Sequence, residues 1–130
     1  MGLRSAAVAL LLVAVPAISM AQLDSPNRKE IKRVDLSGAP GFEVINSVTE
    51  YKPGDELKLH IHHGEESAYV VQGATVQTPG KDPMKLPTGA SLINLRDVPH
   101  GGFKIIGDSN LILFTVHIVE KGKPLYDAPK

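Results

Sequence analysis

Between residues 42 and 120, short hydrophobic runs alternate with turn sequences. The runs are FEVINSVTEY, ELKLHIH, AYVVQG, ASLIN, FKII and LILFTVHIVE. They are rich in β-branched and aromatic residues, and turns with glycine or proline, such as KPGD, TPGKDP and VPHGG, separate them. No run has the length and the 3.6-residue period of a helix. The pattern predicts an all-β fold, either a sandwich or a barrel.

The first 21 residues have a different pattern. Arg4 is followed by an apolar run that carries no charge and ends on the small residues Ser19 and Ala21. This is typical of a secretory signal peptide, and the run is short for a membrane span. We therefore expect cleavage after Ala21 and a periplasmic or secreted protein that is not bound to a membrane, rather than an uncleaved anchor.

The rest of the chain divides into three segments. Residues 22–39 are mostly polar and are interpreted as an N-terminal arm that ends in a short strand near Val34. Residues 40–119 contain the hydrophobic runs and form the expected β-barrel domain. Residues 120–130 are polar, contain two prolines, and are interpreted as a C-terminal tail.

Composition narrows the class of protein. Without residues 1–21 the chain has 130 − 21 = 109 residues, which is one small domain. Removing Arg4 leaves 13 Lys and Arg against 14 Asp and Glu, a net charge of −1, so nothing indicates a nucleic acid or an anionic membrane as partner. The absence of cysteine excludes disulfides, zinc fingers and iron–sulfur clusters. Burial, a metal or oligomerisation must therefore stabilise the fold.

The densest group of potential ligands lies in GDELKLHIHHGEESAYVVQG, residues 54–73. Three histidines and two glutamates fall within the seven positions from His60 to Glu66. In a strand, His60 and His62 would project from one face. The hydrophobic residues that alternate with the polar ones would face the other way. These are Leu57, Leu59 and Ile61. After a tight turn, Glu66 has the phase to join the imidazoles, and such a set of nitrogen and oxygen donors suits a transition metal. The alternative is a hydrated strand face with a charged turn.

The spacing of these residues resembles the first motif of the cupins, Gly-x5-His-x-His-x3-Glu-x6-Gly. In this chain the motif residues are Gly54, His60, His62, Glu66 and Gly73. The resemblance covers roughly residues 40–119, and the first motif is the specific part of it.

The second cupin motif, Gly-x5-Pro-x-Gly-x2-His-x3-Asn, is matched only in part. Gly89 and His100 have its glycine-to-histidine spacing. The proline, second glycine and asparagine positions are occupied by Leu95, Asp97 and Lys104. These departures affect the loop at the mouth of the barrel more than the ligand histidine.

The resemblance implies a single-domain double-stranded β-helix, a jelly-roll barrel of six to eight strands. It also implies one divalent transition metal, iron, manganese, nickel or zinc, held inside by His60, His62, Glu66 and His100. Such a site leaves coordination positions for water, dioxygen or a bidentate ligand.

The leading functional hypothesis is an oxidoreductase resembling the quercetin-dioxygenase-like cupins, in which the metal brings a small oxygen-chelating substrate together with dioxygen. One alternative is a cupin that binds a small ligand or a metal without turnover, and another is a metal-dependent isomerase or lyase. A small molecule is the expected partner, and the resemblance allows a homodimer through sheet edges. The sequence identifies no catalytic residue.

An acid or base that faces the metal without binding it would favour an enzyme over a binding module. His63, Glu65 and His117 are the candidates. His63 and Glu65 have the alternation phase of turn or surface residues. His117 shares a strand face with apolar residues, which favours a packed, hydrogen-bonded histidine. If Glu66 faces inward, the alternate residues of its strand do so too; these are Ala68, Val70 and Gln72.

Overall fold

The structure is a computed structural model that describes residues 23–130, and nine strands form within this range. They are β1 (Arg28–Asp35), β2 (Phe42–Tyr51), β3 (Glu56–Leu57), β4 (Gly64–Gln72), β5 (Ala74–Gln77), β6 (Met84–Leu86), β7 (Ser91–Asn94), β8 (Phe103–Ile106) and β9 (Leu111–Glu120). None of residues 23–130 belongs to a helix long and apolar enough to cross a membrane. The expected signal peptide lies outside the described residues.

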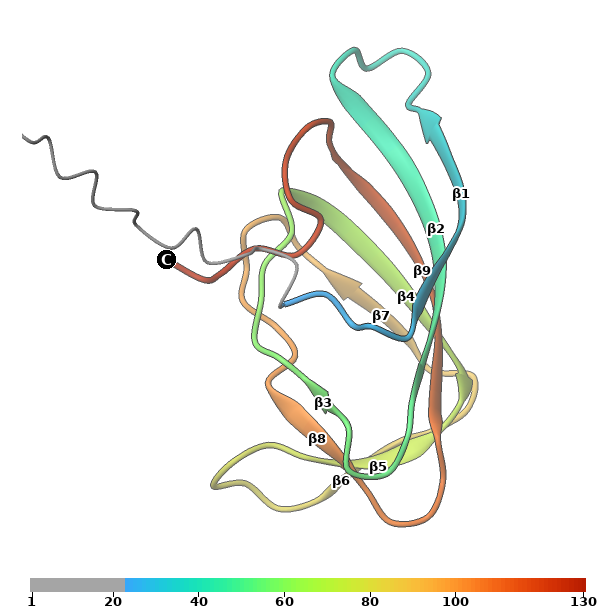
Figure 1. The fold of residues 1–130 in the computed structure, drawn as a ribbon, viewed down its shortest axis with the longest axis vertical. Coiled ribbons are helices and arrows are strands. Elements are labelled where there is room, and N and C mark those ends of the chain that lie inside the picture. The colour runs from blue at the N-terminus through green and yellow to red at the C-terminus, as the bar shows by residue number, and fades with distance from the viewer. Residues whose placement is uncertain (1–22) are drawn as a thin grey trace, which may run out of the picture.

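The strands form two antiparallel sheets that face each other (Figure 1). One sheet has the order β1-β2-β9-β4-β7, and the other has the order β3-β8-β5-β6. The all-β prediction is therefore confirmed, with one strand more than the six to eight that the resemblance implied. From β2 onward the chain crosses between the two sheets at every connection except that between β5 and β6.

The inner face of the five-stranded sheet changes character along its strands. β2 and β9 pair over ten residues each, and their inward side chains alternate with outward ones. The hydrophobic core gathers at one end of these strands, around Tyr51, Leu111 and Leu113. Toward the other end the inward residues of β9 are Thr115 and His117, both buried. The interior thus has an apolar end and a polar end.

Part of the segment expected to be an N-terminal arm, Arg28–Asp35, is strand β1. It pairs with β2 at the edge of the sheet, and ion pairs attach it, including Arg33 Nη1 to Glu43 Oε1 at 2.6 Å. The side chains of β1 are mostly exposed. Charged, exposed residues are usual on edge strands, because they discourage pairing with other chains, and the same composition makes such a strand resemble a polar arm in sequence.

The segment ELKLHIHH is less regular than a strand. Only Glu56 and Leu57 belong to β3, so the two-residue alternation is interrupted before His60. Leu57 is buried and lines the same cavity as His60, which makes the expectation that it faces away from the histidines wrong. Leu59 is half exposed, as an outward residue should be.

Candidate metal centre

The four residues singled out by the cupin motifs come together inside the polar end of the barrel. His60 and His62 come from the segment between β3 and β4, Glu66 from β4, and His100 from the loop before β8. One potential ligand atom from each lies within 4.8 Å of the others. The first three side chains are buried, and His100 is partly exposed.

Backbone hydrogen bonds hold the irregular histidine segment in place. His60 and His100 exchange two of them, each with an N···O distance of 3.0 Å, so these two motif histidines are direct neighbours across a β-bridge. Ile61 forms a second bridge with Asp127, and the His62 carbonyl accepts from the Asp97 N–H at 3.0 Å. The segment is therefore fixed by two separate parts of the chain, the loop before β8 and the C-terminal segment.

The proton positions on the three histidines follow from their hydrogen bonds. Each Nδ1 faces a backbone carbonyl, that of Lys58 for His60, of Leu125 for His62, and of Val98 for His100. A carbonyl can only accept, so each Nδ1 carries the hydrogen and each Nε2 keeps a lone pair. This is the arrangement found in metal-ligating histidines. The Nε2 atoms of His62 and His100 are buried without a hydrogen-bond partner, which fits a metal ion as their missing partner.

Glu66 lies between two cross-strand neighbours. Asn94 on β7 donates from Nδ2 to Glu66 Oε2 at 2.8 Å, and His117 on β9 places Nε2 3.6 Å from Oε1. Oε2 also lies 3.2 Å from Nε2 of His62 and of His100. Neither imidazole nitrogen has a hydrogen-bond partner, so their lone pairs and the carboxylate oxygen face one another, an arrangement that a bound cation would stabilise. The carboxylate is thus oriented toward the histidines.

Burial and the neighbouring charges set the protonation of the cluster. Burial raises the pKa of Glu66, but the side chains of His100 and His62 outweigh it and hold that pKa well below its usual range. Burial lowers the pKa of His60 to about 4. Burial also lowers the pKa of His100, but its contact with Glu66 outweighs this and leaves the pKa raised. A negative carboxylate beside neutral imidazoles is the form that binds a cation.

The C-terminal segment, expected to be a tail, forms one wall of the centre. Its backbone pairs with Ile61, and its end can be followed beside the segment between β3 and β4 in Figure 1. The ring of Tyr126 is buried, 4.6 Å from the ring of His60 and 4.9 Å from that of His62. The Asp127 carboxylate lies 2.9 Å from His63 Nε2. These contacts cover the centre from the side of residues 125–127.

A cavity of about 90 Å³ adjoins the cluster inside the barrel. Three of the four cluster residues line it, namely His60, Glu66 and His100. The other walls are mostly apolar, with a few polar groups; the polar ones are Thr49, Tyr51, Asn94, Thr115 and Tyr126. Burial raises the pKa of the Tyr51 and Tyr126 phenols, so both stay protonated at neutral pH.

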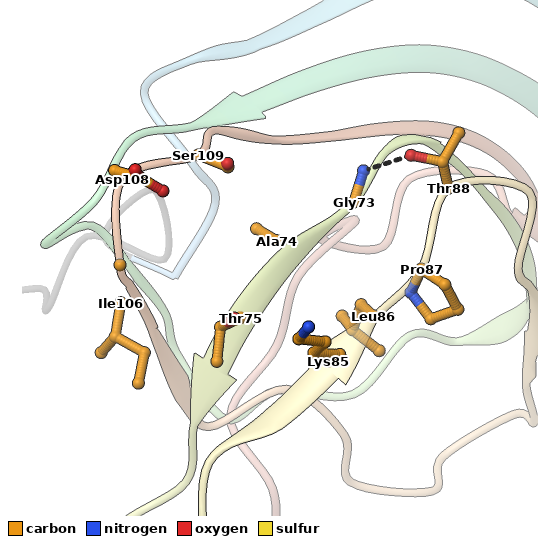
Figure 2. A pocket seen from close by; sticks show the side chains of 11 residues that line it. Gly73, Ala74, Thr75, Lys85, Leu86, Pro87, Thr88, Ile106, Asp108 and Ser109 are labelled. Carbon is orange, nitrogen blue, oxygen red and sulfur yellow. Dashed lines mark hydrogen bonds between the residues drawn. The ribbon is translucent and has the colours of Figure 1, made fainter.

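A larger depression of about 390 Å³ lies elsewhere, between the β5–β6 side and the turn after β8 (Figure 2). Gly73 borders it and donates its N–H to Thr88 Oγ1 at 2.9 Å. Leu86 lines both this depression and the inner cavity. None of the four cluster residues lines it, so we place the function at the smaller cavity, where the imidazoles and the carboxylate converge.

The three residues considered as an extra acid or base lie outside the cavity wall. Glu65 is exposed and points outward. His63 lies between the carboxylates of Asp97, at 3.2 Å, and Asp127. His117 is fully buried, as expected, but neither ring nitrogen has a hydrogen-bond partner among residues 23–130, so the expected hydrogen bond is missing.

One contributor to the site was not recognised in the sequence. Asn94 orients Glu66 and lines the cavity. The second cupin motif has its asparagine position at Lys104, which is exposed here. The only signal for Asn94 is its register opposite Glu66 on β7, and strand pairing is not visible in one sequence.

The departure from the motif at Asp97 has a backbone conformation that suits a glycine. Asp97 stands at the motif's second glycine position and has φ = 58°, in the left-handed region that glycine adopts most easily. Aspartate is among the few other residues that tolerate this region. Its carboxylate contacts His63 Nδ1, so the loop keeps its turn and gains an attachment to the histidine segment.

The fold and the site together define a class: a small double-stranded β-helix protein with a three-histidine, one-glutamate cluster inside the barrel. The family model for the cupin domain matches residues 47–117, more than half of the chain. This protein belongs to the cupin family.

Among solved structures similar to this chain, the first named here supports the fold. A protein with a double-stranded β-helix domain from Klebsiella pneumoniae is 19% identical, with 88% of this chain and 98% of that chain covered and a TM-score of 0.51. A DMSP lyase from Ruegeria pomeroyi is 17% identical (62% and 40% covered, TM-score 0.49), so this chain spans less than half of that enzyme. A polyketide cyclase from Streptomyces resistomycificus is 23% identical (75% and 71% covered, TM-score 0.46). No curated protein matches significantly.

Proposed function

We propose that this protein is an exported cupin that holds one divalent transition metal, iron, manganese, nickel or zinc, through His60, His62, Glu66 and His100. One observation carries the proposal: three imidazoles with free Nε2 lone pairs converge on one buried carboxylate, and two of those nitrogens have no other partner. When bound, the ion would supply Lewis acidity and, for iron or manganese, reactivity with dioxygen.

The leading activity is oxidation of a small oxygen-chelating substrate with dioxygen. The cavity beside the cluster supports it, because a ligand there lies in reach of His60, Glu66 and His100. Apart from these three, no imidazole or carboxylate lines the cavity among residues 23–130. An isomerase or lyase depends on proton transfer by a placed acid or base. For that role the described part of the wall offers only the phenols of Tyr51 and Tyr126, whose pKa burial raises, whereas oxidation of a chelated substrate depends less on such a group.

Binding without turnover is the second candidate. The lack of a further imidazole or carboxylate on the described part of the cavity wall favours it. In this role the metal and the cavity would capture a small molecule, and Tyr51, Asn94, Thr115 and Tyr126 would supply its hydrogen bonds.

Metal content and dioxygen uptake test the proposal together. Protein isolated from its own host without a metal column should contain one equivalent of a divalent transition metal per chain. With iron bound, a small enediol should cause dioxygen uptake that a chelator abolishes. Tight binding of the enediol without uptake would select the binding candidate, and protein from the host without bound metal would contradict the proposal.

Export is proposed from the sequence of residues 1–21. The N-terminus of the periplasmic or secreted protein should be Gln22. Full-length chain in the membrane fraction would contradict both the cleavage and the localisation.

A further inference from the structure

The cavity beside the cluster restricts the size of any ligand. Its volume of about 90 Å³ is smaller than the ~150 Å³ of a protein cavity that binds benzene. Pockets for drug-sized ligands are roughly 300–1,000 Å³. A ligand held wholly inside therefore has on the order of five non-hydrogen atoms. Flavonols and catechols are larger than this.

The charges at the cluster determine which net charge is favoured on a ligand. A carboxylate that binds a metal is ionised, and ligating imidazoles are neutral, so the four residues contribute a charge of −1. With a divalent ion the centre has a charge of +1. Since an uncompensated charge is costly in a buried site, a ligand with a single negative charge is favoured over a neutral one or a dianion.

One hydroxyl on the cavity wall has no partner. Thr115 on β9 is buried and lines the cavity, and its Oγ1 forms no hydrogen bond among residues 23–130. Its cross-strand neighbours do not satisfy it. Ser47 on one side accepts a hydrogen bond from Arg28 Nη1 at 3.0 Å, and Ala68 on the other side has no polar side-chain atom. A buried hydroxyl left unpaired costs ~1–3 kcal/mol, so an oxygen of a ligand or water is expected there.

The position of Thr115 shows where this ligand or water oxygen would lie relative to the cluster. Along β9, Thr115 is two residues from His117, which faces Glu66 across the strand pair, and Thr115 itself faces Ala68. Thr115 is therefore one inward position away from the carboxylate, along the wall of the same cavity. The apolar wall beyond it, with Leu92, Phe103 and Leu113, suits carbon rather than a second charge.

We propose that the cavity binds a small monoanion with adjacent oxygens, of the 2-hydroxy or 2-oxo carboxylate class, and that Thr115 recognises it. Two oxygens of such a ligand can chelate a metal ion, and the remaining carboxylate oxygen can accept a hydrogen bond from the Thr115 hydroxyl. This inference rests on the proposed function, because it requires the metal.

Cobalt-loaded protein provides the test, because the visible absorption of Co²⁺ reports a change in its ligands without any turnover. Glycolate is the probe. Acetate lacks the second chelating oxygen, 1,2-propanediol lacks the charge, and catechol is too large. We expect glycolate to change the spectrum with at least ~10-fold tighter binding than any of the three, which corresponds to about 1.4 kcal/mol.

Three variants test whether the Thr115 hydroxyl binds the ligand. Thr115→Val removes the hydroxyl with little change in shape and should weaken glycolate binding by at least ~10-fold, while Thr115→Ser should remain within ~3-fold of the wild type. Thr49→Val is the matched control, since Thr49 is an equally buried threonine on the wall of the same cavity, and it should also remain within ~3-fold. Each variant is first checked for one bound cobalt per chain.

The outcomes separate this inference from the proposed function. Protein that binds no cobalt would overturn the proposed function. Protein that binds one cobalt but prefers catechol or propanediol to glycolate would overturn the ligand class alone, and this comparison needs only the wild type. Equal losses for Thr115→Val and Thr49→Val would overturn the role of Thr115.

Discussion

Each histidine of the centre is fixed on the side that faces away from the cluster. The three histidines donate Nδ1–H to carbonyls, and Asn94 orients the glutamate. These contacts decide which lone pairs remain free, and they do so before any ion arrives. A metal titration of a variant that lacks one of these lone pairs therefore measures how much that lone pair contributes to metal binding.

Glu66 and Glu65 provide the sharpest comparison at this scale, because they are adjacent in sequence and face opposite ways. Glu66→Gln should weaken metal binding by at least ~10-fold, about 1.4 kcal/mol, because a charged donor becomes neutral. Glu65→Gln should change it little, since an exposed carboxylate acts through screened solvent. Metal titrations of both variants check this, and a larger loss for Glu65→Gln would mean that the register of β4 is wrong.

His117 tests whether proximity to the cluster implies ligation. His117→Phe removes two buried nitrogens that have no hydrogen-bond partner, so we expect the metal-free protein to gain about 1 kcal/mol of unfolding free energy. Metal affinity should fall by less than ~10-fold, whereas His62→Phe should lose more than that. Denaturant unfolding with chelator and metal titration measure the two effects. A loss for His117→Phe as large as for His62→Phe would make His117 a ligand.

At the scale of elements, sequence reasoning succeeded where a strand is regular. The alternation in β4 predicted correctly that Glu66, Ala68 and Val70 face inward, and it failed only at Gln72, where a bulge shifts the pairing with β9. Between β3 and β4 the chain departs from strand geometry, so alternation placed Leu57 on the wrong face. The inward direction of both histidines was still predicted correctly, since long-range backbone bonds impose it.

The glycine after His100 illustrates how tightly this irregular region is packed. Gly101 has φ = 80°, and a Cβ there would lie 2.8 Å from the Lys58 carbonyl oxygen and 3.3 Å from His60 Cε1. Gly107 has nearly the same φ, 81°, with no atom within 4 Å of such a Cβ.

We therefore expect Gly101→Ala to lower both stability and metal affinity, and Gly107→Ala to lower stability alone, by ~1 kcal/mol for its backbone conformation. The comparison of the two variants separates displacement of His60 from backbone strain. Thermal unfolding and metal titration are the measurements. Equal metal affinity in the two variants would show that His60 accommodates the added methyl group.

At the scale of the whole molecule, the sequence indicated the barrel and the four clustered residues but not how the chain ends attach. Polar composition concealed β1, which is an edge strand. It also concealed the C-terminal segment, whose single buried aromatic residue, Tyr126, packs against histidines more than sixty positions away. Contacts over that sequence distance leave no periodic signal, and they depend on a fold that is already formed.

Burying imidazoles makes the metal-free protein sensitive to acid. Burial lowers the pKa of His60 to about 4 and that of His117 to about 3, from the ordinary 6.5. Between pH 6.5 and about 4 the unfolded chain therefore binds more protons than the folded one, and stability falls as the pH falls. His100 opposes this, since its pKa is raised.

We expect each of these two histidines to cost about 2 kcal/mol of unfolding free energy between pH 7.5 and pH 5, partly offset by His100. Denaturant unfolding with chelator at the two pH values measures the loss. His117→Phe should show roughly half of the wild-type pH dependence, because one of the two groups is gone. Equal or greater stability at pH 5 would contradict the burial of neutral imidazoles.

The carbonyl of Leu125 accepts the hydrogen bond that sets the proton on His62. During synthesis, His60, His62, Glu66 and His100 all emerge well before this carbonyl exists. A chain that stops before Leu125 would contain all four ligand residues. The imidazole of His62 would lack the carbonyl that fixes its proton and its orientation. Ion loading should therefore follow synthesis of Leu125, after all four ligand residues have emerged.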